Sequence, residues 1–225
     1  MKKHTQYLSA FALAALLCAS PVLAGKTHTA TVKETVVAAT ALQVNTAGST
    51  MRWNAKKVGG EHYGTIKIAQ GILDVKGSKL TGGTFMIDMG SIVVEDITRP
   101  ESNKRLTDHL KSDDFFGVEQ YPTATFNITK AAPVAKAKAG QPNYTITGNL
   151  TIKGITHPIT FPATVAVKGK SATAAATIEV DRTKYDIKYR SGLIGTAADK
   201  IIADTFTIDL KLTAGEAADK QLGSK

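Results

Sequence analysis

Apolar and polar residues alternate along most of this chain of 225 residues. Every second residue is apolar from Phe206 to Leu212, and the stretch from Ile146 to Ile152 follows the same period of two with Gly148 at one apolar position. Successive side chains of a β-strand point to opposite faces, so this pattern predicts strands with one apolar and one solvated face. The alternation constrains the fold more than any other feature of the sequence.

Turn-forming residues separate these runs, and one short segment follows a helical pattern instead. Turn signals stand at Gly59-Gly60, Gly77-Ser78, Gly82-Gly83, Gly140-Gln141-Pro142, Lys153-Gly154 and Gly169. The helical segment runs from Thr98 to Lys111, and Thr98 and Glu101 have the spacing of a capping box. We therefore expect an all-β fold of about eight antiparallel strands with one short helix, arranged as a sandwich or a closed barrel.

The interior of such a fold can be filled or hollow. A barrel of about eight strands is wide enough to be packed with side chains or to hold one slender ligand. Small residues at positions that should face inward favour some internal space, namely Ala55, Gly148, Ala174 and Ala176. Alternation does not distinguish the two cases, so a filled interior and a hollow one both stay open.

The N-terminus has the pattern of an export signal. Lys2 and Lys3 precede an apolar run from Leu8 to Cys18, and small residues lead to a cleavage site after Ala24. We expect residues 1–24 to be a signal peptide and the mature protein to be periplasmic. A lipoprotein modified at Cys18 is a less favoured alternative, because the bulky Leu17 precedes that cysteine.

The expected cleavage also limits the chemistry of the mature protein. Cys18 is the only cysteine, so the mature chain would have no disulfide, cysteine zinc site or thiol nucleophile. Loss of two lysines would lower the formal net charge from +9 to +7. Beyond the signal peptide we expect a linker or first strand at 25–40, the barrel at 41–213 and a flexible tail at 214–225.

Signals of catalysis or metal binding are scarce, and we predict no catalytic residue, no metal and no cofactor. There is no G-x-S-x-G motif, phosphate loop or histidine pair at metal-ligand spacing. Two alternatives remain: a metal site assembled in space from His62, His109 and His157, and a hydrolase or isomerase that uses His109 with Asp108 or Asp113.

The positive charge argues for an anionic lipid or membrane surface and against nucleic acid. Lysine and arginine are spread along the strands without interleaved aromatic residues, and nucleic acid is not the partner expected of an exported protein. Transient contact with a membrane surface therefore suits the charge. In the helical segment, Arg105 and His109 are candidates for polar contacts at the mouth of a cavity.

Three motifs in the same order resemble the YceI-like proteins. They lie at 106–126, which includes Leu106-Thr107-Asp108-His109-Leu110 and Tyr121-Pro122-Thr123-Ala124, at 148–158 and at 181–187. The resemblance implies an extended, lipocalin-like antiparallel barrel that holds a polyisoprenoid or similar long-chain lipid in its interior. Together with the export signal, the resemblance leads us to expect a periplasmic carrier of a quinone or polyprenyl phosphate type of lipid. We expect the protein to be a monomer or a homodimer.

On this reading, the apolar face of the strands contacts the lipid. The predicted interior ligand contacts are Trp53, Phe126, Ile128, Ile146, Leu150, Phe206 and Ile208, and the predicted contacts at the mouth are Arg105 and His109. The alternative function is an envelope interaction or stress-response protein with a filled barrel.

Overall fold

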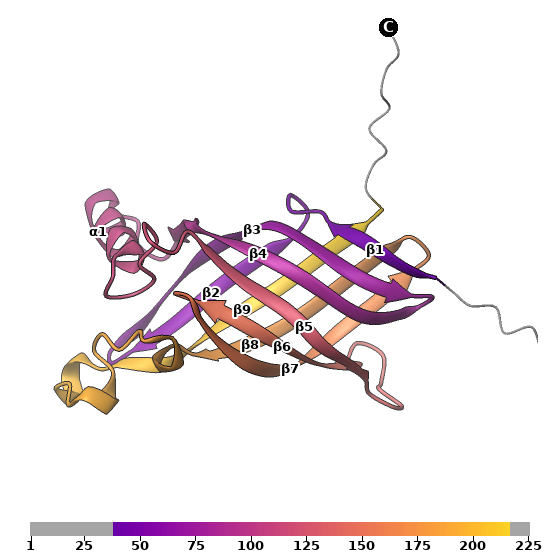
Figure 1. The fold of residues 1–225 in the computed structure, drawn as a ribbon. Helices are drawn as coiled ribbons and strands as arrows, with labels where there is room; N and C mark the ends of the chain where they lie inside the picture. Colours follow the sequence, from indigo (N-terminus) through magenta and orange to yellow (C-terminus); the bar gives the residue numbers. More distant parts are fainter. Residues whose placement is uncertain (1–37, 217–225) are drawn as a thin grey trace, which may run out of the picture. The chain divides into compact units, whose positions relative to one another are not determined.

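The computed structural model describes residues 38–216, which form one antiparallel sheet of nine strands, one α-helix and three short 3₁₀ helices (Figure 1). The strands are β1 (Ala39–Val44), β2 (Thr50–Lys57), β3 (Gly60–Lys76), β4 (Lys79–Val94), β5 (Thr123–Pro133), β6 (Tyr144–Ile152), β7 (Ile155–Lys168), β8 (Ser171–Asp181) and β9 (Ile202–Gly215). The helices are α1 (Pro100–Lys111), η1 (Arg182–Tyr185), η2 (Gly192–Ile194) and η3 (Ala198–Lys200).

The sheet closes on itself. The strand order is β1-β3-β2-β9-β8-β7-β6-β5-β4, and β4 pairs with β3 to complete the ring. Both β1 and β2 pair with β3 on one side and with β9 on the other, so they share one place in the wall. The result is a closed barrel of eight strand positions, which confirms the predicted all-β fold and excludes the sandwich.

The burial pattern follows the predicted alternation. Along β6, Tyr144, Ile146 and Leu150 are buried, whereas Thr145 and Asn149 between them are exposed. The turn after β6 also matches its sequence signal, because Lys153 and Gly154 both adopt positive φ angles, of 50° and 73°. Such angles are typical of the tight turn of a two-residue hairpin.

Gly148 does not contribute internal space, contrary to the sequence-based expectation. A Cβ atom at this position would lie 2.5 Å from the ring of Phe126 and 2.5 Å from the carbonyl oxygen of Asn127. The absent side chain therefore makes room for the Phe126 ring, which also contacts the rings of Phe85 and Phe161. Part of the interior at this level is filled by aromatic side chains.

The helix begins differently from the prediction. Its N-cap is Arg99, which forms no side-chain capping hydrogen bond, so the capping box of Thr98 and Glu101 was wrong. Pro100 begins the helix instead, because its fixed φ suits the first helical position and its missing N–H costs nothing there. The Asn103 side chain donates to the carbonyl oxygens of Val94 and Ile97, at 2.8 and 2.9 Å, and so joins α1 to the end of β4.

The barrel is slightly longer than expected at both chain ends. Strand β1 begins at Ala39, two residues before the predicted barrel boundary, and β9 reaches Gly215, two residues into the segment predicted to be a flexible tail. The predicted signal peptide and most of the predicted linker lie outside the described residues. Within residues 38–216, no helix has the length and apolar character needed to span a bilayer.

Candidate functional site

Two cavities lie inside the barrel, with volumes of about 130 Å³ and about 110 Å³. The first, here called the helix-end cavity, is lined in part by Leu110 of α1 and by Phe115 and Phe116. The second, here called the turn-end cavity, extends to Leu73 and Leu80, which flank the turn between β3 and β4. The two cavities share a belt of five lining residues, Met51, Ile87, Leu150, Val180 and Ile208.

The walls of both cavities are almost entirely apolar. Among the residues that line them, Arg182 is the only charged one. Each volume is about ten times the roughly 10–15 Å³ that one water molecule needs on this measure, but a water also needs two to four polar partners. Cavities of this kind stay dry and accept apolar molecules.

The structure places all seven predicted interior residues on these walls. Trp53 and Phe206 line the helix-end cavity, Phe126, Ile128 and Ile146 line the turn-end cavity, and Leu150 and Ile208 line both. Ala55, Ala174 and Ala176 also line the cavities, as their small size suggested. Contact of these residues with a ligand stays a prediction.

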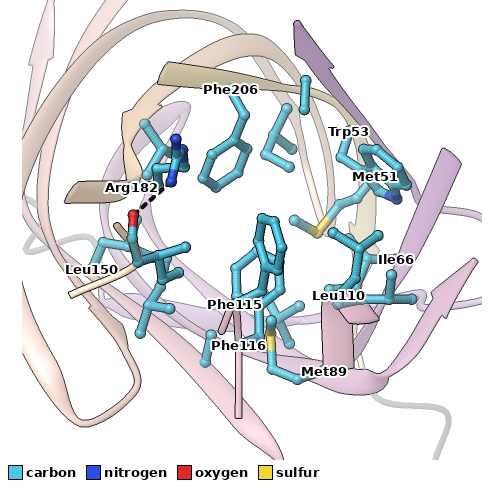
Figure 2. Close-up of a pocket in the computed structure, with 18 of the residues that line it drawn as sticks. Met51, Trp53, Ile66, Met89, Leu110, Phe115, Phe116, Leu150, Arg182 and Phe206 are labelled. Atoms are coloured by element: carbon cyan, nitrogen blue, oxygen red, sulfur yellow. Dashed lines mark hydrogen bonds between the residues drawn. The ribbon is translucent and has the colours of Figure 1, made fainter. Parts of the chain in front are cut away.

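Phe115 and Phe116, in the segment that follows α1, line the helix-end cavity. Figure 2 shows both rings reaching into the helix-end cavity from the side opposite Phe206. The Phe116 ring meets the Phe206 ring edge to face, with 6.3 Å between their centroids. The two adjacent phenylalanines stood in the first family-like motif, but sequence alone did not show that this segment crosses the end of a barrel.

Neither residue predicted for the mouth lines a cavity. Arg105 is exposed on α1. The Nε2 atom of His109 lies 2.9 Å from Oδ2 of Asp114, and its ring contacts Tyr189 edge to face at 4.7 Å. His109 therefore connects α1 to the segment after β8, and its carboxylate partner is Asp114 rather than the anticipated Asp108 or Asp113.

The three candidate metal-binding histidines each contact a different partner. His62 pairs with Asp96 at 2.7 Å, His109 pairs with Asp114, and His157 packs edge to face against Tyr185. Across residues 38–216, no cluster of three or more His, Cys, Asp or Glu side chains could hold a metal ion. The alternative of a metal site built from these histidines thus has no geometric support.

Arg182 is a buried charge that sequence reasoning did not single out, although it lies in the third family-like motif. Only 4% of its surface is exposed. Its Nε, Nη1 and Nη2 groups donate to four carbonyl oxygens at 2.7–3.1 Å and, at 3.5 Å, to a carboxylate. The acceptors are the carbonyls of Ile187, Tyr189, Ile202 and Ala203 and the carboxylate of Asp204.

This arrangement uses all five N–H donors of the guanidinium. Burial lowers the pKa of Arg182, yet a guanidinium starts from so high a value that it remains charged. The side chain therefore ties the segment between β8 and β9 to the barrel at the edge of the helix-end cavity (Figure 2). It has no donor left for a ligand.

Tyr185 is buried beside this site, with 1% of its surface exposed, and its hydroxyl has no hydrogen-bond partner among the described residues. Burial, helped by the negative charge of Asp181, raises the pKa of Tyr185 to about 12. The folded state therefore favours the neutral phenol, while the unfolded chain would ionise near pH 10.

We predict that Tyr185→Phe raises the free energy of unfolding by about 1 kcal/mol at pH 7, because it removes an unpaired buried hydroxyl. The contribution of neutral Tyr185 is complete below pH 10 and is lost as the pH rises toward 12, so the variant should lose less stability over that range. Urea unfolding of both proteins at pH 7, 9 and 11 checks this. A variant less stable than the wild type at pH 7 would contradict it.

Comparison with known proteins identifies the family of this barrel. A family model described as the YceI-like domain matches residues 42–214. The chain belongs to the YceI-like family. This confirms the resemblance seen in the three motifs.

The YceI-like chain is also similar to UPF0312 proteins. It is 31% identical over 108 residues to one from Azotobacter vinelandii, which covers 48% of this chain and 51% of the relative. It is 42% identical over 88 residues to one from Vibrio campbellii, which covers 36% and 44%. The matched part thus spans about half the length of these relatives.

Two solved structures share the fold of this YceI-like barrel. BcnA of Burkholderia cenocepacia has a TM-score of 0.53 at 24% identity, over 76% of this chain and 99% of BcnA. A polyisoprenoid binding domain from Saccharophagus degradans, implicated in plant cell wall breakdown, has a TM-score of 0.53 at 14% identity, over 78% and 98%. At these identities the likeness concerns the fold, and it agrees with the lipocalin-like barrel.

Proposed function

We propose that this YceI-like protein binds a long-chain isoprenoid lipid inside the barrel and serves as a periplasmic carrier or reservoir of it. The observation that carries the proposal is the pair of apolar cavities joined by a shared belt. The fold it shares with a polyisoprenoid binding domain supports the choice of ligand class. The export signal expected at residues 1–24 supports the compartment.

Burial of the hydrocarbon tail supplies the affinity. Each buried methylene contributes about 0.8 kcal/mol, so ten of them give on the order of 8 kcal/mol before ordering costs. That corresponds to roughly micromolar binding without any polar anchor. An apolar cavity can therefore bind a prenyl chain although its lining residues form no recognisable sequence motif.

The same walls limit where a polar head group can lie. A buried phosphate would need a charged or hydrogen-bonding partner, and the donors of Arg182, the only charged lining residue, are all engaged. We infer that the tail occupies the cavities and that a charged head group stays outside them. The lining residues include no acid, histidine or hydroxyl side chain, which supports binding rather than catalysis.

Filling the turn-end cavity tests the proposal directly. Ala176 lines this cavity, whereas its neighbour Ala175 is exposed on the outside of β8. We expect Ala176→Phe to lower uptake of a prenyl quinone at least tenfold, because the added ring takes the space of several methylenes. Ala175→Phe is the matched control and should bind like the wild type.

Uptake is measured by adding detergent-solubilised prenyl quinone to purified protein and determining the mass of the intact complexes by native mass spectrometry. Circular dichroism confirms that both variants fold. Organic extraction of protein purified from its own host should also release an isoprenoid lipid. Repeated absence of bound lipid, with no uptake by the wild type, would refute the proposed function.

A further inference from the structure

Large hydrophobic residues are exposed mainly at one end of the barrel. Six such residues occur within residues 38–216, namely Val58, Tyr63, Val93, Val134, Leu193 and Ile194. All but Val134 belong to the end that carries α1 and the segment between β8 and β9 (Figure 1). Leu193 and Ile194, at 75% and 56% exposure, are the most exposed of the six.

Three of these residues form what we call the apolar tip: Val58, Leu193 and Ile194. Leu193 and Ile194 lie in η2, where the Ser191 side chain accepts the backbone N–H of Leu193 and fixes the turn. Val58 stands in the turn between β2 and β3, and its backbone N–H donates to Ile201 of the same segment at 3.0 Å. The turn and the segment are therefore adjacent, and both present apolar side chains outward.

Exposed cations accompany the apolar tip. Lys57 precedes Val58 and pairs in register with Ile202, whose N–H donates to the carbonyl of Arg190 at 2.9 Å. Lys200 lies two residues before Ile202. Among the described residues, none of these three cations forms an ion pair, and Asp199 directly precedes Lys200 in the sequence. The set of three cations and one acid has a net charge of +2.

Behind this surface lies the helix-end cavity. The segment that carries Leu193 and Ile194 also supplies Ile187 to the cavity wall, and Ile202 and Ala203 at the start of β9 line the same wall. Arg182 joins the segment to β9 through the carbonyls of Ile187 and Ile202. Tyr189 of the segment contacts Phe115 and His109, so the segment and α1 together cover this end. A lipid that enters or leaves the helix-end cavity at this end would pass close to the tip.

We infer that this end of the barrel docks on a bilayer that carries anionic phospholipids. Leu193 and Ile194 insert among the acyl chains, while Lys57, Arg190 and Lys200 contact the phosphate groups at the interface. Exposed apolar side chains with exposed cations on the same turn and segment suit a bilayer, in which an apolar layer lies beneath anionic head groups. The exchange of cargo at this surface rests on the proposed function, whereas docking is measurable without cargo.

The test uses sedimentation of the protein with vesicles of phosphatidylcholine and phosphatidylglycerol that contain no isoprenoid lipid. We expect the double variant Leu193→Ser/Ile194→Ser to lower vesicle partitioning about tenfold, because its buried apolar area is lost. Binding of the wild type should weaken as salt is added, and the double variant Arg190→Glu/Lys200→Glu should bind more weakly and lose most of that salt dependence. A matched control at the opposite end, Val134→Ser/Lys136→Glu, should bind like the wild type.

Partitioning that is unchanged in both tip variants would overturn the inference, and so would a loss confined to the control variant at the opposite end. Equal binding to vesicles of phosphatidylcholine alone would overturn its electrostatic part. Uptake of detergent-delivered prenyl quinone is measured in parallel, and the tip variants should take it up normally. Vesicle docking without any quinone uptake by the wild type would refute the proposed function and leave the docking surface standing.

Discussion

Leu150→Asp is expected to unfold the protein or to abolish lipid uptake. Leu150 is 9% exposed and belongs to the belt shared by both cavities. A carboxylate there would have no cationic partner, because the donors of Arg182 are already engaged. An unpaired buried charge costs about 3–5 kcal/mol, a large part of the 5–15 kcal/mol that stabilises a typical domain.

The matched control for this substitution is Asn149→Asp. Asn149 is the preceding residue of β6, and its side chain is exposed on the outside of the barrel. Asn149→Asp adds the same charge as Leu150→Asp, but at an exposed position. Its free energy of unfolding should therefore differ from that of the wild type by less than about 0.5 kcal/mol. Urea unfolding and quinone uptake compare the two variants with the wild type. If Leu150→Asp melts and binds like the control, the interior assignment of Leu150 is wrong.

Arg182→Lys is expected to destabilise the segment between β8 and β9 and to cost about 3–5 kcal/mol overall. The guanidinium donates hydrogen bonds to five acceptors from a planar fork of N–H groups. A lysine ammonium has only three N–H donors, and they point in different directions. At least two of these five acceptors, and so at least one carbonyl group, would therefore lose their partner in a largely dry site. We expect faster hydrogen exchange of the amides between Ile187 and Asp204.

Lys184→Ala provides the control for this variant. Lys184 lies two residues further along in η1, is exposed and forms no ion pair among the described residues. Its loss should leave both the unfolding curve and the exchange pattern unchanged. Hydrogen exchange with mass spectrometry compares the two variants segment by segment. Exchange in Arg182→Lys at the wild-type rate would show that the segment is held by other contacts.

The sequence predicted the features of the fold that depend on neighbouring residues in the chain. The alternation around Ile146 and Leu150 predicted an inward face, and the Lys153-Gly154 pair predicted a tight hairpin turn. Both hold because the side-chain period of a strand and the φ angles of a turn depend on neighbouring residues alone. The family-like motifs added the barrel, which the period of two could not distinguish from a sandwich.

The arrangement of the helix end depended on contacts between distant residues. Asp114 rather than Asp108 meets His109, because the chain turns after α1 and brings Asp114 back to the histidine ring. Arg182 donates to carbonyl groups up to 21 residues away in the sequence. The Phe116 ring contacts the Phe206 ring across the interior. Helical periodicity and residue type do not encode such partners.

Both β1 and β2 pair with β3 and with β9, and this pairing determines when the barrel can close during folding. Strand β9, the last within residues 38–216, pairs with both β1 and β2, so the ring stays open until β9 has been synthesised. Until then β2 and β8 both have unpaired backbone edges, which invite association with other chains. A product truncated before Ile202 would keep those edges permanently, so the fourteen residues of β9 protect the edges of β2 and β8 from aggregation.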